Sequence, residues 1–215
     1  GALIAVVLSA HLQTAVSRTV LAGVTAGSQP IVDLEADDFV VREDGQNREI
    51  LGVRIADYPV VVLIDNSRER DFDAIRSAAA RFIDRMGQRQ MALGTLANPP
   101  APLTSFDDDR ATLRARLDQV KPASAGAGML LRGIADAARI VANSGTLFSA
   151  IVVISSAPSD ASSGALNELV GQILASGAVV HVVANGSGDE AASMDELRGI
   201  SEQTKGQFTT IYSAA

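Results

Sequence analysis

The sequence predicts an α/β fold in which helices flank a doubly wound, mostly parallel sheet. From Pro59 onward, short apolar runs alternate with segments whose apolar residues recur at helical spacing. The runs Val60–Ile64 and Ile151–Ile154 are unbroken, as is typical of strands covered by helices on both faces. Repeated strand–helix units joined by short loops imply a parallel sheet with right-handed crossovers.

The first 57 residues follow a different pattern, and we expect three segments in the chain. Residues 1–16 contain the apolar run Ala2–Ala10, which is either a secretory signal remnant or a buried element of the fold. Residues 17–57 form a small β-rich lead-in with a hairpin at Asp44-Gly45. Residues 58–215 form the α/β domain, and we expect a closing helix to be missing after its last strand.

Each element of the α/β domain has its own signal. The expected strands, in chain order, are Val60–Ile64, Met91–Leu96, an edge strand at Leu103–Phe106, Ile151–Ile154, Val179–Val183 and Gln207–Tyr212. The first three expected helices are Asp71–Met86, Asp107–Val120 and Met129–Ala142, and Gly87 ends the first of them. A fourth helix runs from a cap at Ser162 or Ser163 to Ser176. A fifth begins with a Ser193/Glu196 capping box and ends near Gly206.

Composition excludes several classes of protein. With 18 basic and 25 acidic residues the net charge is −7, which argues against nucleic-acid binding. The absence of cysteine excludes disulfides, thiolate catalysis and Cys-ligated zinc. His11 and His181 are the two histidines, and we interpret His181 as a core residue with a satisfied hydrogen bond. Nine apolar residues are too few for a membrane-spanning helix, which needs about 20. We expect a protein that is not an enzyme.

The strand end Asp65-Asn66-Ser67 resembles the start of the metal-ion-dependent adhesion site of the von Willebrand factor A domain family. The resemblance covers Pro59 to Tyr212. Upstream, Leu34 to Gly45 matches the pattern L-x-x-x-D-F-x-V-x-E-D-G, which is similar to the lead-in of bacterial, acidobacterial-type members of that family. The resemblance implies a Rossmann-like fold and a secreted or periplasmic protein of the bacterial cell envelope.

Only part of the adhesion site matches the family pattern. Asp65 and Ser67 occupy the first two ligand positions, and Glu69 stands where the third ligand is normally serine. The second loop, Ala125–Met129, has no hydroxyl, and Ser155-Ser156-Ala157 replaces the family's Thr-Asp-Gly. Mg²⁺ or Mn²⁺ would depend on Asp65, Ser67 and Glu69 alone, so we expect a degenerate site and favour a metal-free face without a cofactor.

The sequence therefore predicts a protein-interaction module of the adhesion type that binds a protein partner through the loops at the carboxyl ends of the strands. The predicted binding face consists of Asn66, Arg68, Gly126, Gly128, Met129, Arg132, Ser155, Ser156 and Asp160. Two alternatives stay open. One is a Rossmann-like nucleotide-binding enzyme, although Gly126-x-Gly128 lacks the last glycine of the dinucleotide fingerprint. The other is a structural scaffold domain that pairs through its β segment.

Overall fold

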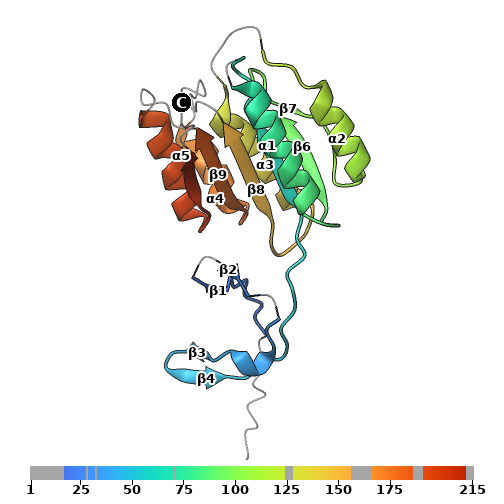
Figure 1. The fold of residues 1–215 in the computed structure, drawn as a ribbon. Helices are drawn as coiled ribbons and strands as arrows, with labels where there is room; N and C mark the ends of the chain where they lie inside the picture. Colours follow the sequence, from blue (N-terminus) through green and yellow to red (C-terminus); the bar gives the residue numbers. More distant parts are fainter. Residues whose placement is uncertain are drawn as a thin grey trace, which may run out of the picture. The chain divides into compact units, whose positions relative to one another are not determined.

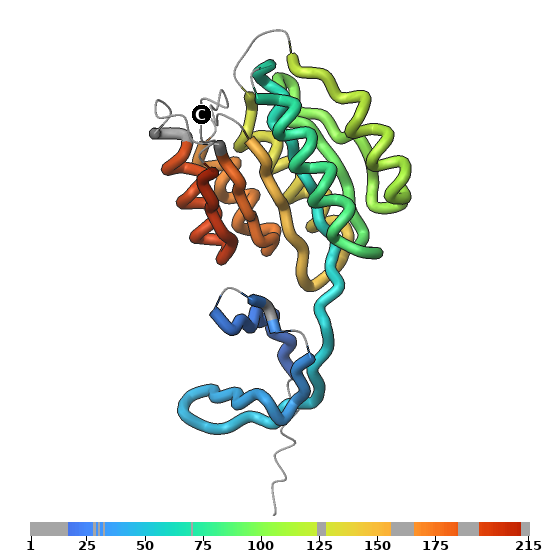
Figure 2. Tube along the Cα trace, in the orientation of Figure 1, coloured from blue at the N-terminus to red at the C-terminus, as the bar shows by residue number. Residues whose placement is uncertain are grey.

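The computed structural model divides the chain into two compact units, residues 1–56 and residues 57–215. Figures 1 and 2 colour both units from blue to red along the sequence. The residues that the structure describes are 17–27, 29–31, 33–69, 71–123, 128–155, 166–185 and 191–211.

The first unit contains two short antiparallel ribbons. Their strands are β1 (Thr25–Ala26) with β2 (Gln29–Pro30), and β3 (Val41–Glu43) with β4 (Gln46–Arg48); a 3₁₀ turn at Ala36–Asp38 lies between the ribbons. The predicted hairpin is confirmed, because Asp44 and Gly45 both have the positive φ that its tight turn requires.

None of the described residues of this first unit is buried. Leu51 and Ile55 are 77% and 76% exposed. The β-like runs Ile31–Leu34 and Glu49–Ala56 are not strands among the described residues. Their sequence has strand propensity, but a strand also needs a neighbouring backbone to pair with.

The second unit is built on one six-stranded sheet. Its strands are β5 (Val60–Ile64), β6 (Met91–Thr95), β7 (Ala101–Pro102), β8 (Ala150–Ser155), β9 (Val179–Asn185) and β10 (Phe208–Ile211). The order across the sheet is β10-β9-β8-β5-β6-β7, and all neighbours are parallel except the β6–β7 pair. This is the predicted doubly wound sheet, with one antiparallel edge strand.

Within the described residues, five helices cover the two faces of this sheet, as Figure 1 shows in outline. They are α1 (Phe72–Arg85), α2 (Arg110–Gln119), α3 (Leu130–Asn143), α4 (Leu166–Ala175) and α5 (Ala191–Gln203). One cluster of buried side chains joins α1 and α2 to the face formed by Val60, Val62 and Ile64. A second cluster joins α3, α4 and α5 to the opposite face, where Val61 and Leu63 point. No helix among these described segments is long and apolar enough to cross a membrane.

Two local predictions are wrong. The edge strand lies at Ala101–Pro102 and not at Leu103–Phe106, because the N–H groups of Leu103 and Thr104 both turn to the carbonyl of Leu93. Helix α5 begins at Ala191, so Ser193 lies inside the helix and cannot cap it. The predicted caps Ser162 and Ser163 lie outside the described residues.

Candidate functional site

The candidate site lies where the strand order reverses. Strand β5 has β6 on one side and β8 on the other. The chain first passes from β5 to β6 and β7 in one direction, and later crosses to β8, β9 and β10 in the other. In open α/β sheets the loops at the carboxyl ends of the strands diverge at such a point and leave a crevice. Asp65 directly follows β5, and Ser155 is the last residue of the adjacent β8.

Asp65 is the centre of a buried hydrogen-bond network. Its side chain is buried, with the residue 2% exposed. The hydroxyl of Ser67 donates to Oδ1 at 2.6 Å, and the backbone N–H of Ser67 donates to the same oxygen at 3.0 Å. The hydroxyl of Ser155 donates to Oδ2 at 2.6 Å. Oxygens of an ionised carboxylate only accept hydrogen bonds, so these three donors compensate part of the cost of burying the charge.

Gly128 lies directly against this network. A Cβ at that position would come within 3.4 Å of both Asp65 Oδ1 and Ser67 Oγ, and within 3.1 Å of the Leu96 carbonyl oxygen. The next residue, Met129, precedes α3, and its N–H donates to the same Leu96 carbonyl at 2.8 Å. A side chain at residue 128 would therefore be crowded by the Leu96 carbonyl, and it would lie in ordinary contact with the carboxylate network.

Asn66 connects three loops and points into the protein. Its Nδ2 donates to the Lys121 carbonyl at 3.1 Å, and its Oδ1 accepts from the Ala97 N–H at 3.1 Å. Its own carbonyl accepts from the Ala123 N–H at 2.7 Å. The sequence predicted Asn66 as part of a binding surface. In the structure its amide group is hydrogen-bonded internally, which makes it a residue that positions the loops.

The other predicted site residues are more exposed. Arg68 and Glu69 lie at the surface after Ser67, and the Glu69 carbonyl accepts from the Phe72 N–H at the start of α1. Arg132 lies in the first turn of α3 and is paired with Asp136 at 3.4 Å. Gly126, Ser156 and Asp160 lie outside the described residues.

The described residues offer few free ligand positions for a divalent cation. A carboxylate has about four lone-pair positions, and three of those on Asp65 already accept hydrogen bonds from Ser67 and Ser155. Among the described residues, no group of three or more His, Asp or Glu side chains could hold a metal ion. Mg²⁺ requires near-ideal octahedral oxygen geometry, and Ca²⁺ takes six to eight oxygens. One largely satisfied carboxylate with two hydroxyls is a weak donor set for either ion.

Sequence reasoning missed the loop that follows β6. Leu96 donates its N–H to the Ile64 carbonyl and accepts from Met129, so its backbone bridges the first and second loops. Ala97 then donates to Asn66. The sequence did contain a signal for this loop. The predicted strand Met91–Leu96 is parallel to Val60–Ile64, so both strands must end at the same edge of the sheet, next to the site.

His181 is a second polar group on the sheet. It lies on β9, is half-buried, and its Nδ1 accepts a hydrogen bond from the Gln207 N–H at 3.2 Å. The predicted satisfied hydrogen bond is therefore present, although the side chain is not fully buried. Desolvation lowers the pKa of His181 below its ordinary value of 6.5, because burial disfavours the charged imidazolium.

The lowered pKa of His181 predicts a loss of stability in mild acid. Well above pH 6.5 the imidazole of His181 is neutral in both the folded and the unfolded state. As the pH falls below 6.5, the unfolded state takes up the proton first, so the free energy of unfolding decreases until the folded-state pKa is also passed. Urea unfolding at pH 7.5 and 5.5 measures this decrease, which should be smaller in His181→Gln. His11→Gln is the control, and an equal decrease in His181→Gln and the parent protein would contradict the prediction.

Comparisons with known proteins find similar structures, and no match to a protein family or to a curated protein. No protein-family model matches the chain, and no curated protein matches it either. A von Willebrand factor type A structure from Catenulispora acidiphila is 17% identical with a TM-score of 0.62, over 73% of this chain and 39% of that one. Mussel byssus proximal thread matrix protein 1, described with a zinc-occupied MIDAS motif, is 16% identical with a TM-score of 0.60, over 72% and 41%.

A third similar structure is an aerotolerance-related membrane protein from Bacteroides fragilis, 16% identical with a TM-score of 0.57, over 72% of this chain and 91% of that one. The present chain thus spans about two fifths of the first two proteins and most of the third. At these identities the comparisons establish the fold and leave the activity to be argued from the site.

Proposed function

The chain contains a von Willebrand factor A-like domain. We propose that this domain is a non-enzymatic module that binds a protein partner. The binding face consists of the loops at the carboxyl ends of β5 and β8 and the loop before α3. The observation that supports the proposal is the network of Asp65, Ser67 and Ser155, which Gly128 approaches closely. It ties the described residues after β5 to the last residue of β8 where the strand order reverses, and a preorganised binding face lowers the entropy cost of binding a partner.

The face acts without a metal ion. In this proposal the Ser67 and Ser155 hydroxyls take the place of a cation by donating to Asp65. The exposed Arg68 and Glu69, together with Arg132, then supply the charged groups that contact the partner. Charged groups at the rim of such a face contribute to partner choice and to the rate of association.

Calorimetric titration with Mg²⁺ and Mn²⁺ tests the metal-free clause. We expect no binding at millimolar or tighter affinity, because three of about four lone-pair positions on Asp65 are already used. Binding in that range, lost in Asp65→Ala, would show instead that the site is a working metal-ion-dependent adhesion site.

A capture experiment from an extract of the source cells tests partner binding. We expect the immobilised protein to retain a defined partner in the presence of EDTA, and to lose it when Arg68 and Arg132 are both changed to alanine. Glu202→Ala is the matched control, because this exposed residue lies near the end of α5, at the opposite edge of the sheet. Equal capture by the double variant and the control would contradict the proposed face.

We also propose an extracytoplasmic location for the protein. Its support is the fold that the chain shares with the membrane protein of Bacteroides fragilis. Fractionation of the source cells, with an antibody against residues 57–215, tests it: the protein should accompany periplasmic or secreted markers and be absent from the cytoplasmic fraction.

A further inference from the structure

Strand β10 forms one edge of the six-stranded sheet, and no described strand pairs with its outer side. On its inner side the Val182 N–H donates to the Gln207 carbonyl at 2.8 Å, in register with the pairing of Phe208 to Val182. Along a strand, the N–H and C=O groups of successive residues point alternately to the two sides. The backbone groups of Phe208 and Thr210 therefore point outward, where no described residue hydrogen-bonds to them.

The outer side of β10 lacks the features that usually protect a sheet edge. Natural edge strands are kept short, or carry charged residues or proline, so that they do not pair with other chains. The opposite edge of this sheet has such protection, because β7 consists of Ala101 and Pro102 and follows the pair Pro99-Pro100. In contrast, Gln207 and the residues of β10 include neither a charged residue nor a proline. The aromatic and β-branched residues of β10 have high strand propensity.

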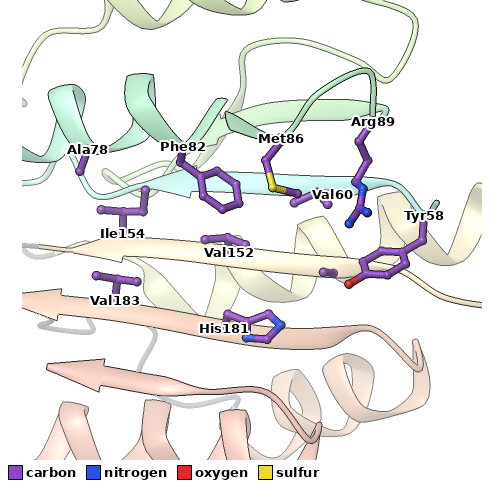
Figure 3. Close-up of a pocket in the computed structure, with 11 residues that line it drawn as sticks. Tyr58, Val60, Ala78, Phe82, Met86, Arg89, Val152, Ile154, His181 and Val183 are labelled. Carbon is purple, nitrogen blue, oxygen red and sulfur yellow. The ribbon is translucent and has the colours of Figure 1, made fainter. Parts of the chain in front are cut away.

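A helix packed on this sheet leaves the outer side of β10 free. The backbone hydrogen bonds of a strand lie in the plane of the sheet, whereas helices pack on its faces. The closing helix expected after the last strand belongs on such a face, for example over the groove in Figure 3 that Phe82 and His181 help to line. Packing in that groove and pairing at the edge are therefore independent.

We propose that two copies of this chain pair through β10 in an antiparallel arrangement. A twofold axis at Thr209 places Phe208 of each copy opposite Thr210 of the other. Residues opposite each other in this way exchange both of their backbone hydrogen bonds, so the outward groups of Phe208 and Thr210 are all used. Aromatic residues opposite β-branched residues, and threonine opposite threonine, are favourable cross-strand pairs. The same surface of each copy forms the interface, as a twofold axis requires.

The charges on α5 are complementary in the same arrangement. The Arg198 guanidinium lies 4.5 Å from the centroid of the Phe208 ring, so this stripe of α5 lies over the sheet edge. Asp195 and Arg198 are both exposed, and their spacing of three residues puts them on one stripe of the helix.

The direction of α5 decides which charges meet. Since α5 connects the parallel strands β9 and β10, it runs antiparallel to them, and Asp195 lies about 4.5 Å beyond Arg198 toward the carboxyl end of β10. A twofold axis at Thr209 then brings Asp195 of each copy close to the level of Arg198 of the other. This self-complementary charge order favours a second copy over an unrelated strand as the occupant of the edge.

The edge is separate from the loop face proposed above, so either proposal can fail without the other. In an antiparallel pair the carboxyl ends of the two sheets point in opposite directions. The dimer would therefore present its two loop faces at opposite ends, which lets one dimer hold two partner molecules.

Sedimentation velocity of the intact protein at increasing concentration tests the proposal. We expect a monomer that converts to a dimer as the concentration rises through the micromolar range. Hydrogen exchange identifies the surface involved. The amides of Phe208 and Thr210 should exchange more slowly as the dimer forms, while the amide of Thr209, which faces β9, should be slow at every concentration.

Changing Thr210 to proline isolates the edge. Proline removes the outward N–H of residue 210 and is tolerated on an edge strand, so circular dichroism should show a folded protein. The dimer should be weakened about tenfold or more, because each copy loses a hydrogen bond to the other. Thr210→Val is the matched control: it keeps the N–H and the β-branched shape, and should dimerise like the parent protein.

Exchanging charges on α5 keeps the proposal testable if Thr210→Pro does not fold. Asp195→Arg and Arg198→Asp should each weaken the dimer about threefold or more, and the two changes together should restore it. Glu168→Arg, a similar charge change at an exposed residue of α4, should leave the dimer unchanged.

Three results would overturn the proposal. They are a monomer at every concentration, a dimer that both Thr210→Pro and the single charge changes leave intact, and Phe208 and Thr210 amides that already exchange slowly in the monomer. The last result would mean that another part of the chain covers the edge.

Discussion

Changing Gly206 to alanine is expected to lower the free energy of unfolding by roughly 3 kcal/mol or more. A Cβ at residue 206 would overlap the backbone carbonyl of Val180, at a distance that real Cβ atoms essentially never show. The obstacle is backbone of a central strand, so it cannot rotate away as a side chain can. Gly206 is also fixed from its other side, because its N–H donates to the Ser201 carbonyl at 2.7 Å.

Gly199→Ala is the matched control for this prediction. Residue 199 lies inside α5, and its nearest neighbour would be Gln203 Nε2 at 3.9 Å, so the new methyl group has room. Alanine should raise the free energy of unfolding there by about 0.5–1 kcal/mol, because it is the better helix former. Urea unfolding measures both changes. A Gly206→Ala variant as stable as the parent would show that the turn after α5 can move away from β9.

Changing Asn66 to alanine is expected to lower the free energy of unfolding by roughly 1–3 kcal/mol, the second largest effect. The change removes the side chain that accepts from the Ala97 N–H and donates to the Lys121 carbonyl. The N–H of the buried Ala97 would be left without its partner, at a cost of about 1–3 kcal/mol, whereas the carbonyl of the exposed Lys121 can turn to water. The three connected loops should also loosen, which hydrogen exchange would detect as faster exchange of the Ala97 and Ala123 amides.

Two further variants isolate this effect. Asn66→Asp keeps an acceptor for Ala97 but turns a second acceptor toward the Lys121 carbonyl, so it should recover only part of the lost stability. Asn143→Ala, at the exposed end of α3, should change stability by no more than about 0.5 kcal/mol. If Asn66→Ala lowered the free energy of unfolding no more than Asn143→Ala, the hydrogen bonds of the Asn66 side chain would contribute nothing to stability.

Much of the fold could be predicted from the sequence because local patterns and tertiary packing agree. The run Val60–Ile64 is a strand over the predicted residues, and Gly87, which was expected to end the first helix, has a φ of +64°. The two wrong predictions, the edge strand and the Ser193 cap, both concern where an element begins or ends. Such boundaries depend on which distant group accepts the hydrogen bond of each backbone N–H. Here the Leu93 carbonyl accepts from both Leu103 and Thr104.

The candidate site was less predictable because its contacts join distant parts of the chain. Sequence reasoning selected Asp65, Ser67 and Ser155 as site residues, yet it did not foresee that both hydroxyls donate to the one carboxylate. It also placed Asn66 on a binding surface. The two side-chain hydrogen bonds of Asn66 reach residues 31 and 55 positions away, and no local pattern in the sequence marks them.

The hydrogen bond from Ser155 to Asp65 also has a consequence for synthesis on the ribosome. It joins residues 90 positions apart, across the pairing of β5 with β8. The unit β5–α1–β6 uses nearby residues only, so it can assemble while the rest of the chain is still being made. The carboxylate of Asp65 acquires its last donor only when β8 has left the ribosomal tunnel, so a nascent chain cannot display the finished loop face before then.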